Sequence, residues 1–414
     1  MDKIINNLDK LDSSKHFCMA PWVHLYILPN LNTLPCCVSP HEDSFGSLKE
    51  GNIQSTWNSQ KFKETRLSML NDQPVANCNY CYTLEESGIS SMRKQFNENY
   101  RDNFEIVKNT EGDGGVKDLK LRYLDFRFSN RCNFKCRGCS PTLSTSWYDD
   151  HQKLWDFKSE EQKLVNDIAE NPQIKTELFE QLKNVKTAYF AGGEPLMMQE
   201  HYDCLDYLIE HNLVDVSLSY STNLSVLRFK KYDLIDLWRK FKSVQLIVSL
   251  DEIGERGEYF RSGLEWTKFV ENLSQIKEQL PHAKILINCT VSLFNINRLA
   301  EIHEYLFSNK FIDEKGFVLN TLVTPECYRM QVLPLNIKKK VRFKLLMYLK
   351  NLPRLFPEVD WGYLSIAISN QIKFMMKEDH SDLLKEFKDR TIKLDQIRGE
   401  DFQKVFPDLA PLLE

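Results

Sequence analysis

The residues best suited to chemistry are three cysteines in one stretch of eight, Cys132-Asn133-Phe134-Lys135-Cys136-Arg137-Gly138-Cys139. Their C-x3-C-x2-C spacing comes just after a strand-like run over residues 119–128. As thiolates, three cysteines can hold three corners of a metal cluster and leave the fourth metal without a protein ligand. Structural sites fill every coordination position, whereas reactive sites keep one open. The spacing therefore indicates chemistry rather than a structural role.

A second group of cysteines lies within the first hundred residues: Cys18, the adjacent Cys36 and Cys37, and the C-x2-C pair Cys78 and Cys81. A C-x2-C pair places two thiols on one turn, and two upstream cysteines would complete a four-thiolate site. The spacing alone favours a structural zinc ion and an iron–sulfur cluster about equally. Because Cys36 and Cys37 are neighbours, we expect one of them to be a spare buried thiol.

Composition sets the broad class. The chain has 414 residues, enough for two or three domains, and its 42% hydrophobic and 27% charged content is ordinary for a globular protein. The net charge of −4 gives no general attraction to nucleic acid. Residues 1–16 do not resemble a signal peptide, and no apolar run reaches the roughly 18 residues that span a bilayer. We therefore expect a cytoplasmic protein without nucleic-acid or membrane partners, whose eleven cysteines are metal ligands more than disulfides.

Alternating strands and helices position the cysteine triplet. Helical stretches, such as residues 199–211 and 266–280, separate six strand-like runs, which cover residues 119–128, 186–190, 215–220, 243–250, 284–292 and 316–323. Parallel neighbours need such crossovers, so the pattern predicts an α/β fold with a parallel sheet. Ligands of these sheets bind beyond the carboxyl ends of the strands, where the triplet lies.

The remaining regions differ in pattern. Residues 55–70 predict one amphipathic helix with Trp57, Phe62, Leu67 and Leu70 buried, and residues 109–115 are polar and glycine-containing, as in a linker. After residue 334 the chain is mostly helical, at 337–350, 364–377 and 381–397. We therefore expect three parts: a small irregular cysteine-rich domain (1–110), an α/β core (118–330) and a helical C-terminal extension (331–414).

Gly192-Gly193-Glu194-Pro195 ends the second predicted strand. Two glycines let the backbone approach a ligand closely, and a carboxylate on the turn can hold a cationic amine. Alone, these four residues would be an ordinary turn before a helix. Here they follow the next strand after the cysteine triplet, at the same end of the sheet.

With these two motifs in this order, the chain resembles the radical S-adenosylmethionine (radical SAM) enzymes. The resemblance implies a partial (β/α)6 barrel in which Cys132, Cys136 and Cys139 ligate a [4Fe–4S] cluster. It also implies that S-adenosylmethionine completes the fourth iron, with its amine held at Gly192, Gly193, Glu194 and Pro195. Asn223, in Ser221-Thr222-Asn223, and Ser249, in Ser249-Leu250-Asp251, match further cofactor-binding positions at the ends of the third and fourth strands. Arg261, in Phe260-Arg261-Ser262-Gly263, resembles the arginine that meets the methionine carboxylate. One departure is Gly138, where the family often has a large residue that packs on adenine. Stacking would then come from elsewhere, such as Phe134 or a backbone edge.

The first region is similar to the auxiliary-cluster modules called SPASM and twitch domains. The matching segments are residues 17–22, 35–37, 51–53, 56–59 and 78–81. The twitch form implies one [4Fe–4S] cluster on Cys18, Cys36, Cys78 and Cys81, with Cys37 in reserve. These modules usually follow the barrel, whereas here the segment precedes it. Together the two resemblances cover about residues 17–330.

The resemblance implies an enzyme that cleaves S-adenosylmethionine reductively to a 5′-deoxyadenosyl radical, which then abstracts hydrogen from a substrate. An auxiliary cluster favours oxidation or cross-linking, and a reducing partner such as flavodoxin or ferredoxin is implied. A peptide or protein side chain is one substrate class, although no winged-helix leader-binding segment is evident. A small metabolite such as a sugar or nucleoside is the alternative. A non-catalytic iron–sulfur or zinc protein is a third reading.

Overall fold

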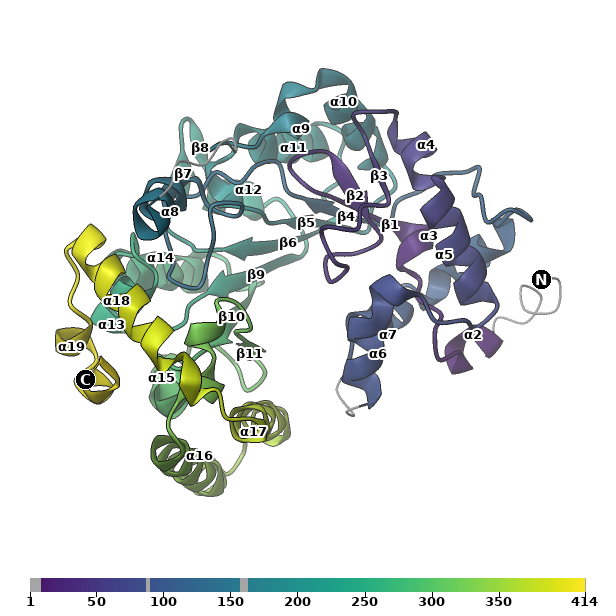
Figure 1. Ribbon diagram of the computed structural model, residues 1–414. Helices are drawn as coiled ribbons and strands as arrows, with labels where there is room; N and C mark the ends of the chain where they lie inside the picture. The colour runs from purple at the N-terminus through teal and green to yellow at the C-terminus, as the bar shows by residue number, and fades with distance from the viewer. Residues whose placement is uncertain (1–8, 87–89, 157–162, 414) are drawn as a thin grey trace. The chain divides into compact units, whose positions relative to one another are not determined.

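The computed structural model describes residues 9–86, 90–156 and 163–413 and divides the chain into two compact units (Figure 1). Unit 1 comprises residues 1–129, 165–192 and 198–219; unit 2 comprises residues 130–164, 193–197 and 220–414. Neither unit ends at residue 110 or at residue 330, the boundaries expected from the sequence. The part expected to be a separate N-terminal domain therefore shares a unit with the first strands of the core.

Unit 1 holds the strands β1 (His24–Ile27), β2 (Asn32–Leu34), β3 (Gly46–Ser47), β4 (Tyr123–Phe126) and β5 (Thr187–Phe190), in the order β3-β2-β1-β4-β5. β4 and β5 are parallel, with Asp125 opposite Tyr189. β1 pairs in parallel with β4 and antiparallel with β2. The first region thus extends the core sheet, which its irregular sequence pattern did not indicate.

Helices of unit 1 include α2 (Asp9–Ser13), α3 (Ala20–Val23), α6 (Asn79–Glu86), α7 (Met92–Asn99), α9 (Asp167–Glu170), α10 (Pro172–Gln181) and α11 (Gln199–Glu210). The single helix predicted over 55–70 is wrong: two helices, α4 (Ile53–Trp57) and α5 (Gln60–Leu70), occupy it. Asn58 and Ser59 lie between the two helices, and their side chains form hydrogen bonds to residues outside both helices. Asn58 Oδ1 accepts from Val116 N (2.8 Å), and Ser59 Oγ donates to the Phe45 carbonyl (2.5 Å). Trp57, Phe62 and Leu70 are buried as predicted, and Leu67 only in part.

The expected linker, residues 109–115, is a tight turn held against α5. Thr110 and Val116 form a β-bridge, and the Gly114 carbonyl accepts from Arg66 Nη1 (3.2 Å). Gly114 has φ of 87°, and a Cβ there would lie 2.3 Å from the Lys63 carbonyl oxygen. Only glycine fits this close approach. The segment therefore belongs to the packed body of unit 1.

Unit 2 holds β9 (Val244–Ser249), β10 (Lys284–Val291) and β11 (Phe317–Thr321), all parallel. β6 (Ser217–Thr222) begins in unit 1, ends in unit 2 and stands between β5 and β9 in the strand order. The order β4-β5-β6-β9-β10-β11 follows the chain, as expected of a (β/α)6 core. Before the C-terminal extension, the helices of unit 2 are α8 (Tyr148–Trp155), α12 (Leu234–Trp238), α13 (Gly254–Phe260), α14 (Trp266–Gln279) and α15 (Leu299–Ser308). A small hairpin pairs β7 (Arg228–Phe229) with β8 (Tyr232–Asp233). The predicted α/β fold with a parallel sheet is confirmed.

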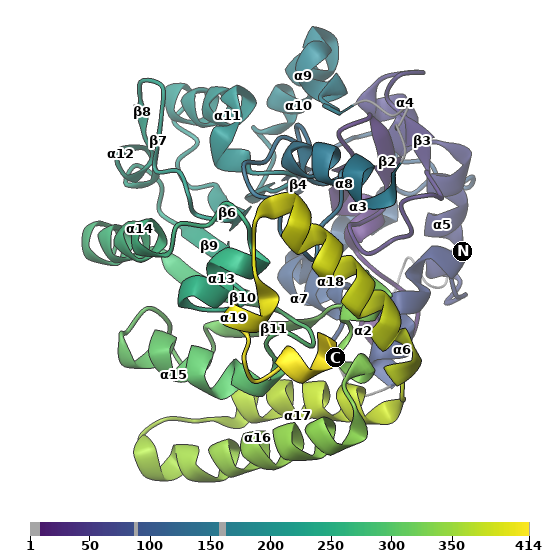
Figure 2. The same cartoon turned by 60° about the vertical axis from the view of Figure 1, so that its left-hand side comes forward.

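The C-terminal extension consists of α16 (Leu335–Leu355), α17 (Gly362–Lys377), α18 (Leu384–Arg398) and α19 (Phe402–Val405). α16 and α17 lie side by side, and α18 packs against α8 (Figure 2). The ring of Phe294, which follows β10, contacts the rings of Phe387, Phe402 and Phe406 at centroid distances of 5.7, 5.9 and 5.7 Å. The extension is therefore part of the core of unit 2.

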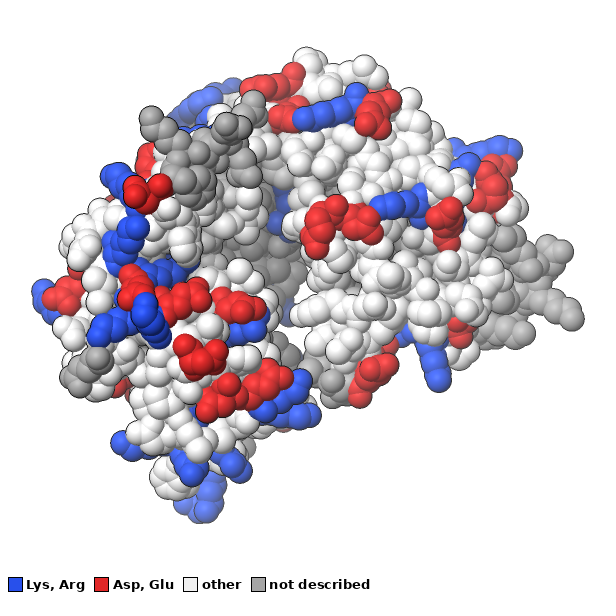
Figure 3. Space-filling view, viewed as in Figure 1, with Lys and Arg blue, Asp and Glu red and all other residues white. Residues whose placement is uncertain are grey.

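Charged side chains of both signs are interspersed over the face shown in Figure 3. This agrees with the small net charge of the chain. Within the described residues, no helix combines the length and the apolar character needed to cross a bilayer.

Candidate active site

The cysteine triplet lies on a loop of unit 2, residues 132–139, which we call the cluster loop. Backbone hydrogen bonds join it to the end of α13: Lys135 N donates to the Ser262 carbonyl (2.9 Å) and Arg137 N to the Phe260 carbonyl (2.7 Å). From the other side, Trp147 Nε1 donates to the Cys136 carbonyl (2.5 Å). The loop thus has a defined shape although it contains no regular secondary structure.

The three thiols are half-buried and lie within electrostatic reach of one another. Burial, together with charge on Glu194 and Cys136, raises the pKa of Cys132 to about 12, and burial together with charge on Cys136 raises the pKa of Cys139 to about 12. Burial also raises the pKa of Cys136, while the Arg261 guanidinium lowers it. Arg261 Nη1 lies 3.7 Å from the Cys136 sulfur. Three thiolates can therefore coexist here only with added positive charge, which a bound iron cluster supplies.

Glu194 is fully buried, and its carboxylate bonds to protein groups rather than facing outward. Oε1 accepts from Thr222 Oγ1 (2.7 Å) and Leu196 N (3.1 Å), and Oε2 accepts from Asn223 N (2.7 Å). Burial raises the pKa of Glu194 to about 7, although these three hydrogen bonds lower it. Glu194 thereby ties the glycine turn to the end of β6. Its role as an amine-binding carboxylate stays a prediction.

The two glycines of this turn are required by close packing. Gly192 has φ of 109°, and a Cβ there would lie 2.9 Å from the Ser129 carbonyl oxygen. A Cβ on Gly193 would lie 2.1 Å from the Arg131 carbonyl oxygen, which also accepts from Glu194 N (2.7 Å). Pro195 then opens a buried 3₁₀ turn, residues 195–197. The turn is thereby placed directly against the backbone that leads into Cys132.

Asn223, Ser249 and Arg261 stand at the positions expected from the sequence, but two of them are engaged with protein groups. Asn223 Nδ2 donates to Asn133 Oδ1 (2.9 Å) and lies 3.9 Å from the Cys132 sulfur. Arg261 Nε forms a buried ion pair with Asp251 Oδ2 (2.8 Å). Ser249 is the last residue of β9, opposite Asn288 of β10. Asn223 and Arg261 therefore connect neighbouring strand ends to the cluster loop.

Gly138 fits because its surroundings are already filled. A Cβ at this position would lie 3.0 Å from Leu322 Cδ1 and 3.4 Å from Phe260 Cζ. Phe134 is 1% exposed and packs on Gly263, where a Cβ would be 3.0 Å from its ring. Phe134 therefore has no open face for stacking on adenine. Phe260 and Leu322 occupy the space that a large residue at position 138 would need.

In unit 1, charge on members of a group of four cysteines raises the pKa of other members. Burial raises the pKa of Cys18, and charge on Cys78, Cys36 and Cys81 raises it further. Burial likewise raises the pKa of Cys78 to about 12, with added contributions from Cys36 and Cys81. The four thiols expected to form an auxiliary site, Cys18, Cys36, Cys78 and Cys81, thus lie within electrostatic reach of one another.

Cys37 has different neighbours. Burial raises the pKa of its thiol to about 12, and the next largest contribution comes from Asp125 on β4. Asp125 is itself paired with Arg127, with Nε 3.0 Å from Oδ1. Charge on Cys36 raises the pKa of Cys37 less than charge on Asp125 does. That Cys37 is the spare thiol of the pair stays a prediction.

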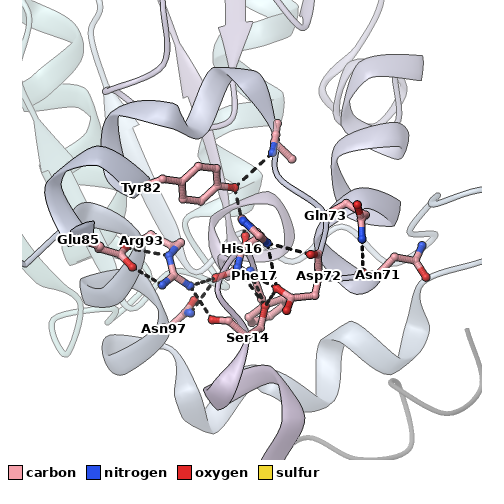
Figure 4. Close-up of polar contacts among 11 residues, drawn as sticks. Ser14, His16, Phe17, Asn71, Asp72, Gln73, Tyr82, Glu85, Arg93 and Asn97 are labelled. Atoms are coloured by element: carbon pink, nitrogen blue, oxygen red, sulfur yellow. Dashed lines mark hydrogen bonds and ion pairs between the residues drawn. The ribbon is translucent and has the colours of Figure 1, made fainter. Parts of the chain in front are cut away.

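A polar network fixes the segments that carry Cys18, Cys78 and Cys81 (Figure 4). Arg93 Nη1 donates to the Phe17 carbonyl (2.7 Å), and its guanidinium pairs with Glu85 of α6 (2.5 Å). Asn97 Nδ2 donates to the same carbonyl (3.0 Å). Tyr82, next to Cys81, donates to the His16 carbonyl (3.4 Å). The residues flanking Cys18 are thus bound to α6 and α7.

The donor sets fit iron–sulfur clusters chemically. All eleven cysteines are free thiols, and none forms a disulfide. Within the described residues, no group of three or more His, Cys, Asp or Glu side chains is arranged as a site for one metal ion. A cluster differs from a single ion because several irons and sulfides stand between the thiolates. Three thiolates in the cluster loop and four in unit 1 match the two ligand sets implied by the sequence resemblance.

Sequence reasoning missed several residues that shape the site. Thr222 and Asp251 lay inside quoted motifs, but no role was assigned to either. Asn133 lay inside the cysteine stretch without an assigned role, and Trp147 lay outside every motif. Residues 394–400 contact the cluster loop from positions more than 250 residues away, so no local pattern shows the contact.

Comparisons with known proteins support the prediction of iron–sulfur clusters and S-adenosylmethionine. Residues 18–82 match the SPASM family, an iron–sulfur cluster-binding domain. GTP 3′,8-cyclase from Campylobacter lari is 26% identical over 135 residues, which make up 33% of this chain and 36% of that protein. The match thus spans about a third of the length of that relative. The expected iron–sulfur clusters and S-adenosylmethionine agree with these findings.

Two kinds of solved structure are also similar. anSMEcpe with bound AdoMet and Cp18Cys peptide is 18% identical, with a TM-score of 0.36 over 57% of this chain and 60% of that one. Streptococcus suis SuiB bound to S-adenosylmethionine is 15% identical, with a TM-score of 0.39 over 72% of this chain and 69% of that one.

Proposed function

We propose that the chain cleaves S-adenosylmethionine reductively. The predicted resemblance to the radical SAM enzymes, with an iron–sulfur domain in the first region, is confirmed and supports this proposal. The observation that carries the proposal is the cluster loop of unit 2. It gathers three half-buried thiols beside a glycine turn that Glu194 braces against the end of β6.

In this proposal each group has a defined part. Cys132, Cys136 and Cys139 hold a [4Fe–4S] cluster as thiolates, and Arg261 offsets part of their charge. The backbone of Gly192 and Gly193 approaches the methionine amine, with Glu194 fixing the turn and Pro195 ending it. When bound, the reduced cluster and S-adenosylmethionine supply methionine and a 5′-deoxyadenosyl radical that takes hydrogen from a substrate C–H bond.

A second [4Fe–4S] cluster on Cys18, Cys36, Cys78 and Cys81 completes the proposal. It rests on the SPASM match and on the shared electrostatic neighbourhood of these thiols. A second redox centre would accept an electron from a substrate radical, so oxidation or cross-linking is the proposed reaction. A flavodoxin or ferredoxin is the proposed electron donor for the first cluster.

A peptide or protein side chain is the proposed substrate class, because the SPASM-type module resembles those of peptide-modifying enzymes. The competing substrate class is a nucleotide or another small metabolite. The 135-residue likeness to GTP 3′,8-cyclase favours that alternative.

The test begins with anaerobic reconstitution of the full chain, followed by iron and sulfide analysis. Two [4Fe–4S] clusters give about eight irons per chain. With dithionite and S-adenosylmethionine, the wild type should form 5′-deoxyadenosine, and the triple variant Cys132→Ala/Cys136→Ala/Cys139→Ala should form none. Continued formation by the triple variant would refute the proposal, and zinc in place of iron would support a non-catalytic protein.

GTP is the probe for the small-molecule alternative. Stimulation of 5′-deoxyadenosine formation by GTP, with a new nucleotide product in the mass spectrum, would favour the nucleotide class. If the substrate is a peptide, GTP should not stimulate 5′-deoxyadenosine formation. The peptide encoded by a small open reading frame beside the gene should instead change in mass when it is incubated with the enzyme.

A further inference from the structure

Arg137, between the second and third cysteines of the cluster loop, has a side chain that the proposed chemistry does not use. Its guanidinium is fully buried, and its central carbon lies 3.8 Å from the centroid of the Tyr259 ring. Burying a guanidinium is costly unless opposite charges accompany it. Its stacking on Tyr259 offsets only part of that cost.

The opposite charges come from the end of the C-terminal extension. Arg137 Nη2 pairs with Asp395 of α18 and with Glu400, which is 2.5 Å away. The Asp395 carboxylate also accepts from Tyr259 Oη (2.7 Å) and Phe402 N (2.7 Å). Its position is therefore fixed by three separate elements of unit 2.

A second set of contacts joins the same helix to the loop. Arg398 Nε donates to Asp150 Oδ2 (2.8 Å), and Lys135 of the loop pairs with the same carboxylate oxygen (3.0 Å). Trp147, which bonds the Cys136 carbonyl, lies 4.7 Å from the Arg398 guanidinium carbon. Cys139 packs against the buried apolar side chains of Trp147 and Leu394. Loop residues from Lys135 to Cys139 are thus held, directly or through α8, by residues 394–400.

We propose that Asp395 and Glu400 are positioning residues for the cluster loop, which hold Arg137 and thereby Cys136 and Cys139 in the geometry that binds the cluster. This inference rests on the proposed function, because it assigns the C-terminal tail to the same cluster site. The tail is then an outer wall of the site, and it contributes two negative charges within the cluster's surroundings.

Two consequences follow from the charges and contacts. Without the two carboxylates, Arg137 loses its anchor, and the loop gives up iron more readily. Outer-shell partners of metal ligands change metal affinity by about 10- to 100-fold when removed. Loss of the two negative charges also favours the reduced, more negative cluster, so its midpoint potential moves in the positive direction.

The experiment uses the reconstituted full chain as wild type, as Asp395→Asn/Glu400→Gln, and as the control Asp389→Asn. Asp389 lies on the same helix in an exposed ion pair with Lys385. In the double variant, iron bound by the cluster loop should be released to a chelator about tenfold faster than in the wild type, or faster still. Iron bound in unit 1 and the control variant should release at the wild-type rate.

The second measurement is the midpoint potential of the loop cluster by EPR-monitored titration, which should be more positive in the double variant only. Circular dichroism checks folding, and the single variant Glu400→Gln, in which one carboxylate remains, replaces a double variant that does not fold. Wild-type protein that loads no iron at the loop refutes the proposed function. Wild type that loads normally, with a variant that releases iron at the wild-type rate, refutes the positioning role alone.

Discussion

Replacement of Glu194 by glutamine should remove a large part of the pH dependence of stability. The carboxyl group is fully buried, and burial raises its pKa from 4.5 to about 7. Glutamine keeps the size of the side chain and an acceptor oxygen for Thr222 but does not titrate. The substitution therefore isolates the proton from the shape of the site.

The magnitude follows from the two pKa values. A raised carboxyl pKa means that the folded state holds a proton which the unfolded state releases, so stability is full below pH 4.5 and falls as pH rises through 7. A pKa raised from 4.5 to about 7 corresponds to about 3 kcal/mol. Most of that loss occurs between pH 5 and pH 8.

Urea unfolding of the cluster-free protein at pH 5, 6, 7 and 8 measures the effect. The stability of the wild type relative to Glu194→Gln should fall by roughly 2 to 3 kcal/mol across this range. Burial also raises the pKa of Glu252 to about 7, but both proteins share this group, so it cancels in the difference. Glu278→Gln, on the exposed face of α14, is the control and should parallel the wild type. Parallel curves for the wild type and Glu194→Gln would show that this carboxyl does not titrate in that range.

Two further predictions concern the glycine turn and the paired cysteines. Gly193→Ala should destabilise the protein by about 3 kcal/mol, the upper end of the overpacking range, and reduce loop-bound iron, because the new Cβ meets the Arg131 carbonyl at 2.1 Å. Gly112→Ala, where nothing lies within 4 Å of the added Cβ, is its control, and equal urea midpoints for the two would contradict the packing argument. Cys36→Ala should lower reconstituted iron by about four per chain, whereas Cys37→Ala should leave it unchanged; the reverse result would make Cys37 the ligand.

The strands and most helices could be predicted because the local sequence pattern of each segment determines its secondary structure. β9 and β10 are apolar runs bounded by polar turns, and α14 has an apolar stripe at helical spacing, so short windows suffice. α16 extends beyond the predicted 337–350 at both ends, to Leu335 and Leu355, and it includes Pro353, which the sequence pattern did not place inside a helix. The break between α4 and α5 was not predictable, because Asn58 and Ser59 form hydrogen bonds to Val116 and Phe45 that no local pattern shows.

The site divides in the same way. The cysteine spacing and the Gly-Gly-Glu-Pro turn are local and were identified, but the direction of the Glu194 side chain was not. A carboxylate on a turn can face a ligand or the protein, and the choice depends on Thr222 and Asn223, which lie 28 and 29 residues away. Gly138 is similar: it looked like a missing stacking residue until Leu322, far along the chain, was seen to fill the space.

The burial of the charged side chain of Arg137 also depends on residues far away in the sequence. Arg137 alone reads as an exposed loop cation, because a lone charge in a polar loop is normally solvated. Its complete burial requires Asp395 and Glu400, which are 258 and 263 residues away. A motif scan therefore finds the ligands of a cluster site, whereas the groups that hold those ligands come from whatever the fold packs behind them. In this chain that is the C-terminal extension, and the site is complete only when residues 394–400 are counted with the cysteines.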